Sequence, residues 1–317
     1  MDSTENDSKS FSIGLITQDR PSAIETVLNS LAQQTRTPDE IIVIDDSDDD
    51  RTGQIVSEAN KTTFNELGVK VQYFQNSGGN QPVARNKILS ICTGDILCFL
   101  DDDTFAPRKW LESLVETYKH HPDVDAIGGP ALTADENLEV QQELLEVSEN
   151  QNRYLKYGEV LDESDRWVPP SVTETEKFRG ANMSFRVSAL ESVGGFDESY
   201  KGNGYREEDD VTVRLVQDGR LLLYNPEALV YHFISPEGGA RHGDKRELEY
   251  WKGRNIVYFK RKNFADQYYV AVLRLFLWTS GEVPPVWRDV MMSRNSSVFS
   301  KIRGYLAEIL DPRDPPK

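Results

Sequence analysis

From Phe11 onward, short apolar runs alternate with segments in which apolar residues recur at helical spacing, a pattern typical of a layered α/β domain. The apolar runs predict strands over residues 11–16, 40–44, 69–74 and 95–100. Ser22 is placed to cap a first helix, and prolines open two more, so helices are expected over residues 22–31, 82–91 and 107–118.

The regular pattern weakens after Gly129. The polar stretch from Ala134 to Asp165 predicts one helix and an exposed excursion. A helix that begins near Glu207 and a strand over Leu221–His232 follow, and from about Asn263 the chain is aromatic and apolar before a Pro-rich tail. We therefore expect an α/β body followed by a C-terminal helical extension.

The composition narrows the classes of function. Of 317 residues, 38% are hydrophobic, which is enough for a sizeable core, and the formal net charge is −17. A surface this acidic repels phosphate backbones, so a general nucleic-acid binder is excluded, and the balance suggests a salt-loving source. Cys92 and Cys98 have no metal-type spacing with a histidine and are interpreted as core residues of a protein in a reducing compartment.

The ends of the chain bear on its location. Residues 1–10 are polar, have no features of a secretory signal and are expected to form a disordered tail. The apolar stretch Tyr268–Trp278 is shorter than the roughly 20 residues of a membrane span. A basic and aromatic cluster before it predicts a cytoplasmic protein in peripheral contact with the inner face of the membrane. A basic helix packed against the acidic body is the alternative reading of its charges, which are Lys252, Arg254, Lys260, Arg261 and Lys262.

Acidic residues follow two of the predicted strands. Asp45–Asp50 closes the second strand, where carboxylates can accept hydrogen bonds from a base or a ribose, although a solvated acidic turn is the favoured reading of the run taken alone. Asp101, Asp102 and Asp103 close the fourth, and oxygen-only ligands of this kind select Mg²⁺ or Mn²⁺. Parallel strands deliver both groups to the sheet edge at which open α/β folds bind ligands.

Three further groups are ambiguous when read alone. The acidic residues of 205–210 precede a predicted helix, where they could serve only to stabilise its N-terminus. His232 ends a predicted strand, a position that is more often structural than metal-ligating. Arg85 lies inside a predicted helix, where an arginine is ordinarily a surface residue.

The order and spacing of these groups resemble inverting family 2 glycosyltransferases of the GT-A fold, over roughly residues 11–260. The acidic composition adds a resemblance to a haloarchaeal glycan-assembly type. The motifs that carry the likeness stand at residues 13–21 (IGLITQDRP), 34–35, 38, 42–47, 78–79, 84–86, 94–103 (GDILCFLDDD), 180–183, 194–198 and 205–210 (YREEDD).

The resemblance implies a Rossmann-like nucleotide-diphospho-sugar transferase with a mostly parallel central sheet. Its nucleotide-sugar-binding half would be residues 11–130, its acceptor-binding half residues 131–262, and its C-terminal helical segment and tail residues 263–317. The donor would be UDP- or GDP-linked, and the acceptor a growing, lipid-linked glycan. The family's processive polymerases carry a QxxRW motif and several membrane spans, which this sequence does not show, so transfer of one sugar per event is expected.

The same resemblance assigns roles to individual residues. Asp101 and Asp103 are the outer members of the DxD motif and would hold Mg²⁺ or Mn²⁺, and His232 falls where some members supply a third ligand. Glu208 would be the general base, in a position where the family usually has Asp, and Glu207 is the second choice. Donor contacts are expected from Thr17, Asp46, Arg85 and Asp102, and acceptor contacts from Asp210 and Asn182.

Two other functions remain open at the level of sequence. A nucleotidyltransferase of similar layered fold would make an activated sugar, although the loop after the first strand is not the Gly-rich phosphate loop that such enzymes carry. A non-catalytic, cation-binding acidic protein is the other alternative, although no EF-hand loop is present.

Overall fold

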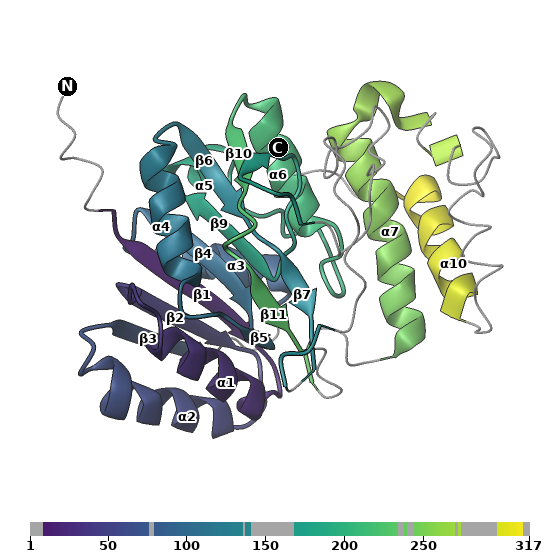
Figure 1. The fold of residues 1–317 in the computed structure, drawn as a ribbon. Helices are drawn as coiled ribbons and strands as arrows, with labels where there is room; N and C mark the ends of the chain where they lie inside the picture. The colour runs from purple at the N-terminus through teal and green to yellow at the C-terminus, as the bar shows by residue number, and fades with distance from the viewer. Residues whose placement is uncertain are drawn as a thin grey trace.

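The computed structural model of the chain describes residues 9–75, 79–135, 137–140, 168–233, 238–239, 244–269, 272–273 and 297–312. Within them, a large twisted sheet lies between two layers of helices, and a pair of helices packs beside this body (Figure 1). Most of the predicted stretch 134–165 and most of the apolar stretch 268–278 lie outside the described residues.

The main sheet has eight strands in the order β3-β2-β1-β4-β9-β6-β10-β8. Its first four strands are mutually parallel, and β9 runs antiparallel to both of its neighbours, so the sheet is mostly parallel, as predicted. The strands are β1 (Phe11–Thr17), β2 (Glu40–Asp45), β3 (Lys70–Gln75), β4 (Ile96–Asp101), β6 (Val124–Gly128), β8 (Thr173–Glu174), β9 (Asn182–Arg186) and β10 (Leu221–Tyr224).

Alternating side chains of the central strands fill two separate cores. In β4, Cys98 faces one core and Phe99 the other, which is the period-2 alternation of a strand buried on both faces. The first core is closed by α1 (Pro21–Ala32), α2 (Arg51–Ala59) and α4 (Trp110–His120), and the second by α3 (Gln81–Ile91), α5 (Val187–Ser192) and α6 (Glu207–Gln217).

A second, three-stranded sheet, in the order β5-β11-β7, joins the two halves of the chain. It is made of β5 (Thr104–Phe105), β7 (Ala131–Thr133) and β11 (Val230–His232). His232 pairs with Thr104, and the N–H of Phe233 donates to the carbonyl of Asp103 at 2.8 Å. This pairing brings the end of β11 against the residues that follow β4.

Three local predictions were wrong. Ser22 does not cap α1, which begins at Pro21 after Arg20 and has no side-chain cap bond. The predicted strand Leu221–His232 is two strands, β10 and β11, because the turn between them carries the chain from the large sheet to the small one. Helix α4 begins at Trp110, three residues after Pro107, whose carbonyl accepts the N–H of Trp110.

The C-terminal extension is helical, as expected, where it is described. Helices α7 (Lys245–Asn263) and α10 (Ser297–Leu310) pack side by side (Figure 1). A Cβ on Gly253 would lie 2.1 Å from the carbonyl oxygen of Lys301, and one on Gly304 would lie 2.0 Å from that of Tyr250, so the two glycines permit the close crossing. Among the described residues, no helix has the length and apolar character needed to cross a membrane.

Candidate active site

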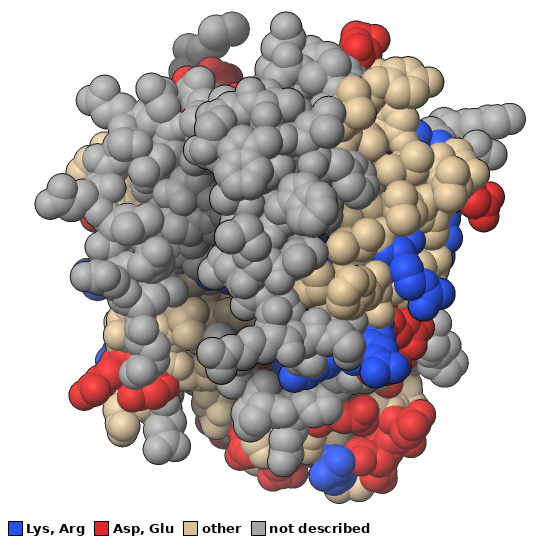
Figure 2. Space-filling view, turned by 90° about the vertical axis from the view of Figure 1, so that its right-hand side faces the viewer, with Lys and Arg blue, Asp and Glu red and all other residues tan. Residues whose placement is uncertain are grey.

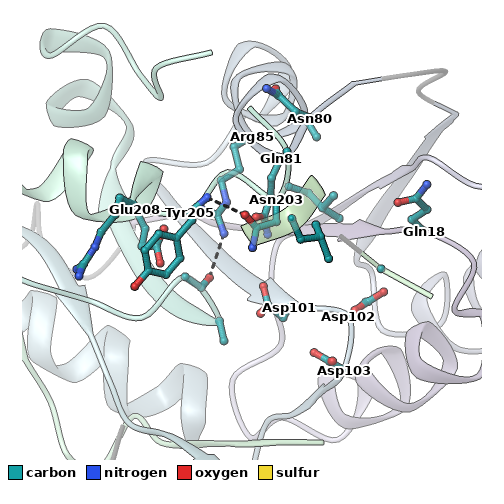
Figure 3. A pocket seen from close by; sticks show the side chains of 18 of the residues that line it. Gln18, Asn80, Gln81, Arg85, Asp101, Asp102, Asp103, Asn203, Tyr205 and Glu208 are labelled. Carbon is teal, nitrogen blue, oxygen red and sulfur yellow. Dashed lines mark hydrogen bonds between the residues drawn. The ribbon is translucent and has the colours of Figure 1, made fainter. Parts of the chain in front are cut away.

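A cleft of about 960 Å³ opens at the carboxyl ends of β1, β2 and β4. Its walls come from the start of α3, the loop before β9, the start of α6 and the first half of α7. Figure 3 shows Asp101, Asp102 and Asp103 on one side of this cleft, Glu208 and Tyr205 on the other, and Arg85 between them. Residues of the Asp101–Asp103 motif and of the acidic motif at 205–210 therefore face the same cavity.

Asp101, Asp103 and His232 converge at the end of β4. One ligand atom of each lies within 4.8 Å of those of the other two, and Nε2 of His232 is 3.0 Å from Oδ1 of Asp103 and 3.8 Å from Oδ2 of Asp101. Asp103 and His232 are buried, while Asp101 is partly exposed to the cleft. Two carboxylates and an imidazole at this spacing fit a divalent ion such as Mg²⁺ or Mn²⁺.

Arg20 lies beside this cluster. Its Nη1 is 2.9 Å from Oδ1 of Asp102 and 3.0 Å from Oδ2 of Asp103. Thr17 Oγ1 donates to the other oxygen of Asp102 at 2.7 Å. Burial and the neighbouring charge of Asp103 raise the pKa of Asp102 to about 7, against the opposing effect of Arg20. Asp102 and Thr17 thus bind each other directly at the floor of the cleft.

In the acidic run after β2, Asp45 has a structural role and Asp46 lines the cleft. Asp45 is fully buried and accepts hydrogen bonds from the hydroxyls of Tyr73 at 2.7 Å and Ser47 at 2.5 Å. Asp46 lines the cleft, and its N–H donates to the carbonyl of Thr17 at 2.9 Å. The backbone bond keeps Asp46 beside the end of β1, where the sequence predicts a donor contact.

Arg85 lies in the wall of the cleft but is almost fully buried, with 2% of its surface exposed. Its Nη1 donates to Oε1 of Glu207, which is also buried, and its guanidinium stacks between the rings of Phe99 (5.6 Å) and Phe196 (5.3 Å). Desolvation lowers the pKa of Arg85, so the charged guanidinium depends on its acidic neighbours. Glu207 is thereby the partner of a buried cation and not a carboxylate facing the cleft.

Glu208 lines the cleft and is partly buried. It forms no ion pair within the described part of the chain. Burial raises the pKa of Glu208, and the adjacent charge of Asp209 raises it further, while Arg85 and Lys177 act in the opposite direction. A carboxylate with a raised pKa in a cleft is suited to accept a proton near neutral pH.

Asp210 and Asn182 do not line the cleft, contrary to the acceptor contacts expected of them. Asp210 is 0% exposed and accepts from Arg214 at 2.8 Å, Lys262 at 2.9 Å and Asn263 at 2.9 Å. Asn182 is 1% exposed, receives the indole N–H of Trp110 at 3.0 Å and donates to two backbone carbonyls. Each forms hydrogen bonds with buried polar groups of other helices, strands and loops. These partners are distant in the sequence, so the motif alone does not reveal them.

Several residues of the cleft were missed in the sequence. Arg20 was inside a quoted motif, and the signal was a lone cation in a loop that follows a strand at the acidic edge. Lys177 carried no signal, because the residues around it have no recognisable spacing, and Trp251 was visible only as a member of the basic and aromatic cluster. Tyr205 is the first residue of the YREEDD motif, which assigned it no role, and it lies beside Glu208 in Figure 3.

The sequence was compared with families and characterised relatives. The profile of Glycosyl transferase family 2 matches residues 12–177, and that of Glycosyl transferase family group 2 matches residues 96–306. The glucosyl-dolichyl phosphate glucuronosyltransferase of Haloferax volcanii is 28% identical over 216 residues, which are 66% of this chain and 63% of that protein. The pre-mycofactocin glycosyltransferase of Mycobacterium tuberculosis is 32% identical over 176 residues, 55% of this chain and 32% of that protein. This chain spans less than two thirds of the length of either relative.

Solved structures share the fold at low identity. The mannosyltransferase PcManGT from Pyrobaculum calidifontis, in complex with GDP-Man and Mn²⁺, matches with a TM-score of 0.56 at 15% identity, over 98% of this chain and 90% of that chain. GalNAc-T7, with UDP, GalNAc and Mn²⁺, matches with a TM-score of 0.59 at 14% identity, over 97% of this chain and 58% of that chain. The predicted GT-A architecture is confirmed. Because the match to Glycosyl transferase family 2, over residues 12–177, covers more than half of the sequence, the chain belongs to this family.

Proposed function

We propose that the protein transfers one sugar, with inversion, from a UDP- or GDP-linked donor to a growing glycan, and that a divalent ion takes part. The observation that carries the proposal is that one cleft contains both a group suited to bind a metal ion and a carboxylate suited to act as a base. The carboxylate and imidazole atoms of Asp101, Asp103 and His232 lie at one side, and the Glu208 carboxylate lies at the other. A donor between them would present its diphosphate to the first group and its sugar to the second.

The donor side supplies what a nucleoside diphosphate requires. A divalent ion held there would neutralise the charge of the leaving diphosphate. Arg20 fixes Asp103 through Oδ2, which leaves Oδ1 facing His232. Asp46 and Thr17, at the ends of β2 and β1, are proposed to contact the base and ribose, and Asp102 the ribose or the sugar. The Mn²⁺ and nucleotide sugar named for the neighbouring structures support this arrangement.

The acceptor side supplies a base. In a single displacement the acceptor hydroxyl attacks the anomeric carbon from the face opposite the diphosphate and loses its proton to a carboxylate. Glu208 faces the cleft, whereas Glu207 is committed to Arg85. We therefore assign the base to Glu208 and give Glu207 and Arg85 a supporting role in the wall of the cleft. We also propose a donor half over residues 11–130 and an acceptor half over residues 131–262, with His232 of the second half contributing to the donor side.

A lipid-linked acceptor is part of the proposal. The name of the Haloferax volcanii relative includes a dolichyl phosphate substrate, which supports an acceptor of this kind. The basic cluster of α7 is a weaker support than the sequence suggested, because its charges are largely paired inside the protein. Lys252 pairs with Glu249, Arg254 and Arg261 with Glu308, and Lys262 with Asp197 and Asp210.

The membrane contact is better supported by α10. Phe299, Leu306 and Leu310 are 68%, 45% and 81% exposed, and they recur at helical spacing. Figure 2 shows the side of the molecule on which α7 and α10 lie, with an uncharged described surface next to Lys and Arg side chains. We propose that this face rests on the membrane from the cytoplasmic side, as a peripheral contact.

The experiment that tests the function directly is a screen of nucleotide sugars with and without Mg²⁺ or Mn²⁺. Release of the nucleoside diphosphate in the presence of a polyprenyl-phosphate acceptor, absent without metal, is the expected result. Hydrolysis or transfer that proceeds unchanged after chelation would remove the metal from the proposal. Formation of a nucleotide sugar from a nucleoside triphosphate and a sugar phosphate would support the nucleotidyltransferase alternative instead.

A further inference from the structure

Arg206 has an unusual backbone conformation at a critical point. Its φ is +77° and its ψ is 7°, in the left-handed region, which residues with a Cβ rarely adopt. It is the residue immediately before α6, whose first two residues are Glu207 and Glu208. Uncommon backbone conformations of this kind persist only where surrounding contacts enforce them, and they gather at functional sites.

The contacts that hold Arg206 come from three directions. Its Nη1 is 2.5 Å from Oδ2 of Asp209, and its guanidinium carbon lies 5.1 Å from the centre of the Tyr205 ring and 6.0 Å from that of Phe259. The side chains of Arg206 and Asp209 are 12% and 3% exposed, so their attraction is little screened by solvent. Phe259 belongs to α7, so Arg206 connects the start of α6 to the C-terminal helices.

The left-handed turn decides where the next side chains point. The N–H of Glu207 donates to the carbonyl of Gly204 at 2.9 Å, and the carbonyl of Arg206 accepts the N–H of Asp210 at 2.9 Å. From this start, Glu207 reaches Arg85 inside the wall and Glu208 enters the cleft. A rotation of the first turn of α6 would exchange the surroundings of these two acids.

We propose that Arg206 is a positioning residue for Glu208: its left-handed backbone aims the carboxylate into the cleft, and its guanidinium balances the neighbouring Asp209. The proposal deepens the proposed function and rests on its assignment of Glu208 as base. Arg206 lines the same cleft, but its guanidinium is engaged by Asp209 and two rings and acts through Glu208.

The charges around Glu208 determine what loss of Arg206 does. Asp209 on α6 faces Glu208 with a negative charge, and Arg85 on α3 and Lys177 before β9 face it with positive charges. Arg206 in turn pairs with Asp209. Loss of Arg206 removes the positive charge that lies 2.5 Å from the Asp209 carboxylate, so the protonated form of Glu208 is favoured. Because the base acts in its deprotonated form, activity should then require a higher pH.

The test uses Arg206→Gly and Arg206→Lys. Glycine can still adopt the left-handed backbone but lacks the guanidinium contacts that hold it there, whereas lysine keeps a positive charge. For Arg206→Gly we expect kcat to fall at least about tenfold with donor KM little changed, since misplacement of a catalytic group by about 1 Å costs about a hundredfold. The acidic limb of the pH profile of kcat, measured at saturating metal, should move to higher pH. Arg206→Lys should recover part of this shift.

The double variant Arg206→Gly/Asp209→Asn separates the two parts of the proposal. Removing the negative charge of Asp209 should return the acidic limb towards its wild-type position, while kcat stays low because the guanidinium contacts that hold the start of α6 are still absent. An Arg206→Gly enzyme with wild-type kcat and pH profile would overturn the inference. A fall in kcat with an unmoved limb would also contradict it, because a general weakening of the fold predicts that result. The proposed function fails separately, if Glu208→Gln retains wild-type turnover.

Discussion

Nη1 of Arg85 donates to Oε1 of Glu207 with 3% and 1% of the two side chains exposed, so one of two adjacent glutamates is a buried counter-ion and the other faces the cleft. In the sequence the two are adjacent members of one acidic motif, and their environments are not visible there. Burial of a guanidinium requires a paired anion, because an isolated charge in a low-dielectric interior is costly. We therefore expect replacement by glutamine to have different effects at Glu207 and at Glu208.

Glu207→Gln should destabilise the protein. The change leaves the Arg85 guanidinium buried without its counter-charge, and breaking a buried pair from one side typically costs about 3–5 kcal/mol. Chemical denaturation measures the free energy of unfolding directly. Glu208→Gln is the matched control and should change that free energy much less, because Glu208 has no ion-pair partner in the described part of the chain. Equal losses in both variants would contradict the distinction between the two residues.

Asp103→Ala should abolish metal binding at the donor side of the cleft. The substitution removes an oxygen ligand and the partner of His232, which is 3.0 Å away. His232→Ala should weaken Mn²⁺ binding by at least about 10-fold, because losing a ligand should cost no less than losing a group that only supports one. Calorimetric titration with Mn²⁺ measures both. Asp46→Asn, in the same cleft but outside the metal-binding group, should keep the affinity; an unchanged affinity in Asp103→Ala would refute the metal assignment.

The pH dependence of turnover should show the raised pKa of Glu208. Burial and the charge of Asp209 raise this pKa above its ordinary 4.5, and the base acts only when deprotonated. Turnover should therefore be full at pH values above the raised pKa and fall as the pH is lowered through it, before an ordinary glutamate would be protonated. The measurement is kcat against pH at saturating donor and metal. An acidic limb centred near 4.5 would mean that another group limits the rate.

Much of the fold was predictable because local patterns determine it. Three of the parallel strands, β1, β2 and β4, are largely apolar runs, and β3 alternates polar and apolar residues, so the positions of all four were predicted within one or two residues. The switch of the chain from β10 to β11 was not, because it depends on pairing between residues 230–232 and segments about 100 residues earlier. Contacts between residues that are distant in the sequence also limit how much of the site could be predicted. Asp101 and Asp103 end a strand and were visible, whereas the burial of Arg85 and of Asp210 arises from partners on distant elements.

The exposed face of α10 predicts binding to lipid. A Phe299→Glu/Leu310→Glu variant should lose flotation with anionic liposomes that the wild-type protein binds, because the two side chains are 68% and 81% exposed and stabilise little within the fold. Lys252→Gln is the control for the alternative reading of α7 and should float normally, since Lys252 is paired with Glu249. A wild-type protein that fails to float at both low and high salt would refute the membrane contact.

The central claim is that Glu208 removes the acceptor's proton, and the turnover of Glu208→Gln tests it most directly. A general base touches neither the diphosphate nor the metal, so donor affinity should stay near that of the wild type, while kcat should fall by about 100- to 10,000-fold. Donor affinity and single-turnover transfer should be measured on the same preparation, with Glu207→Gln alongside. A Glu208→Gln enzyme that binds donor normally and turns over near the wild-type rate would contradict the account.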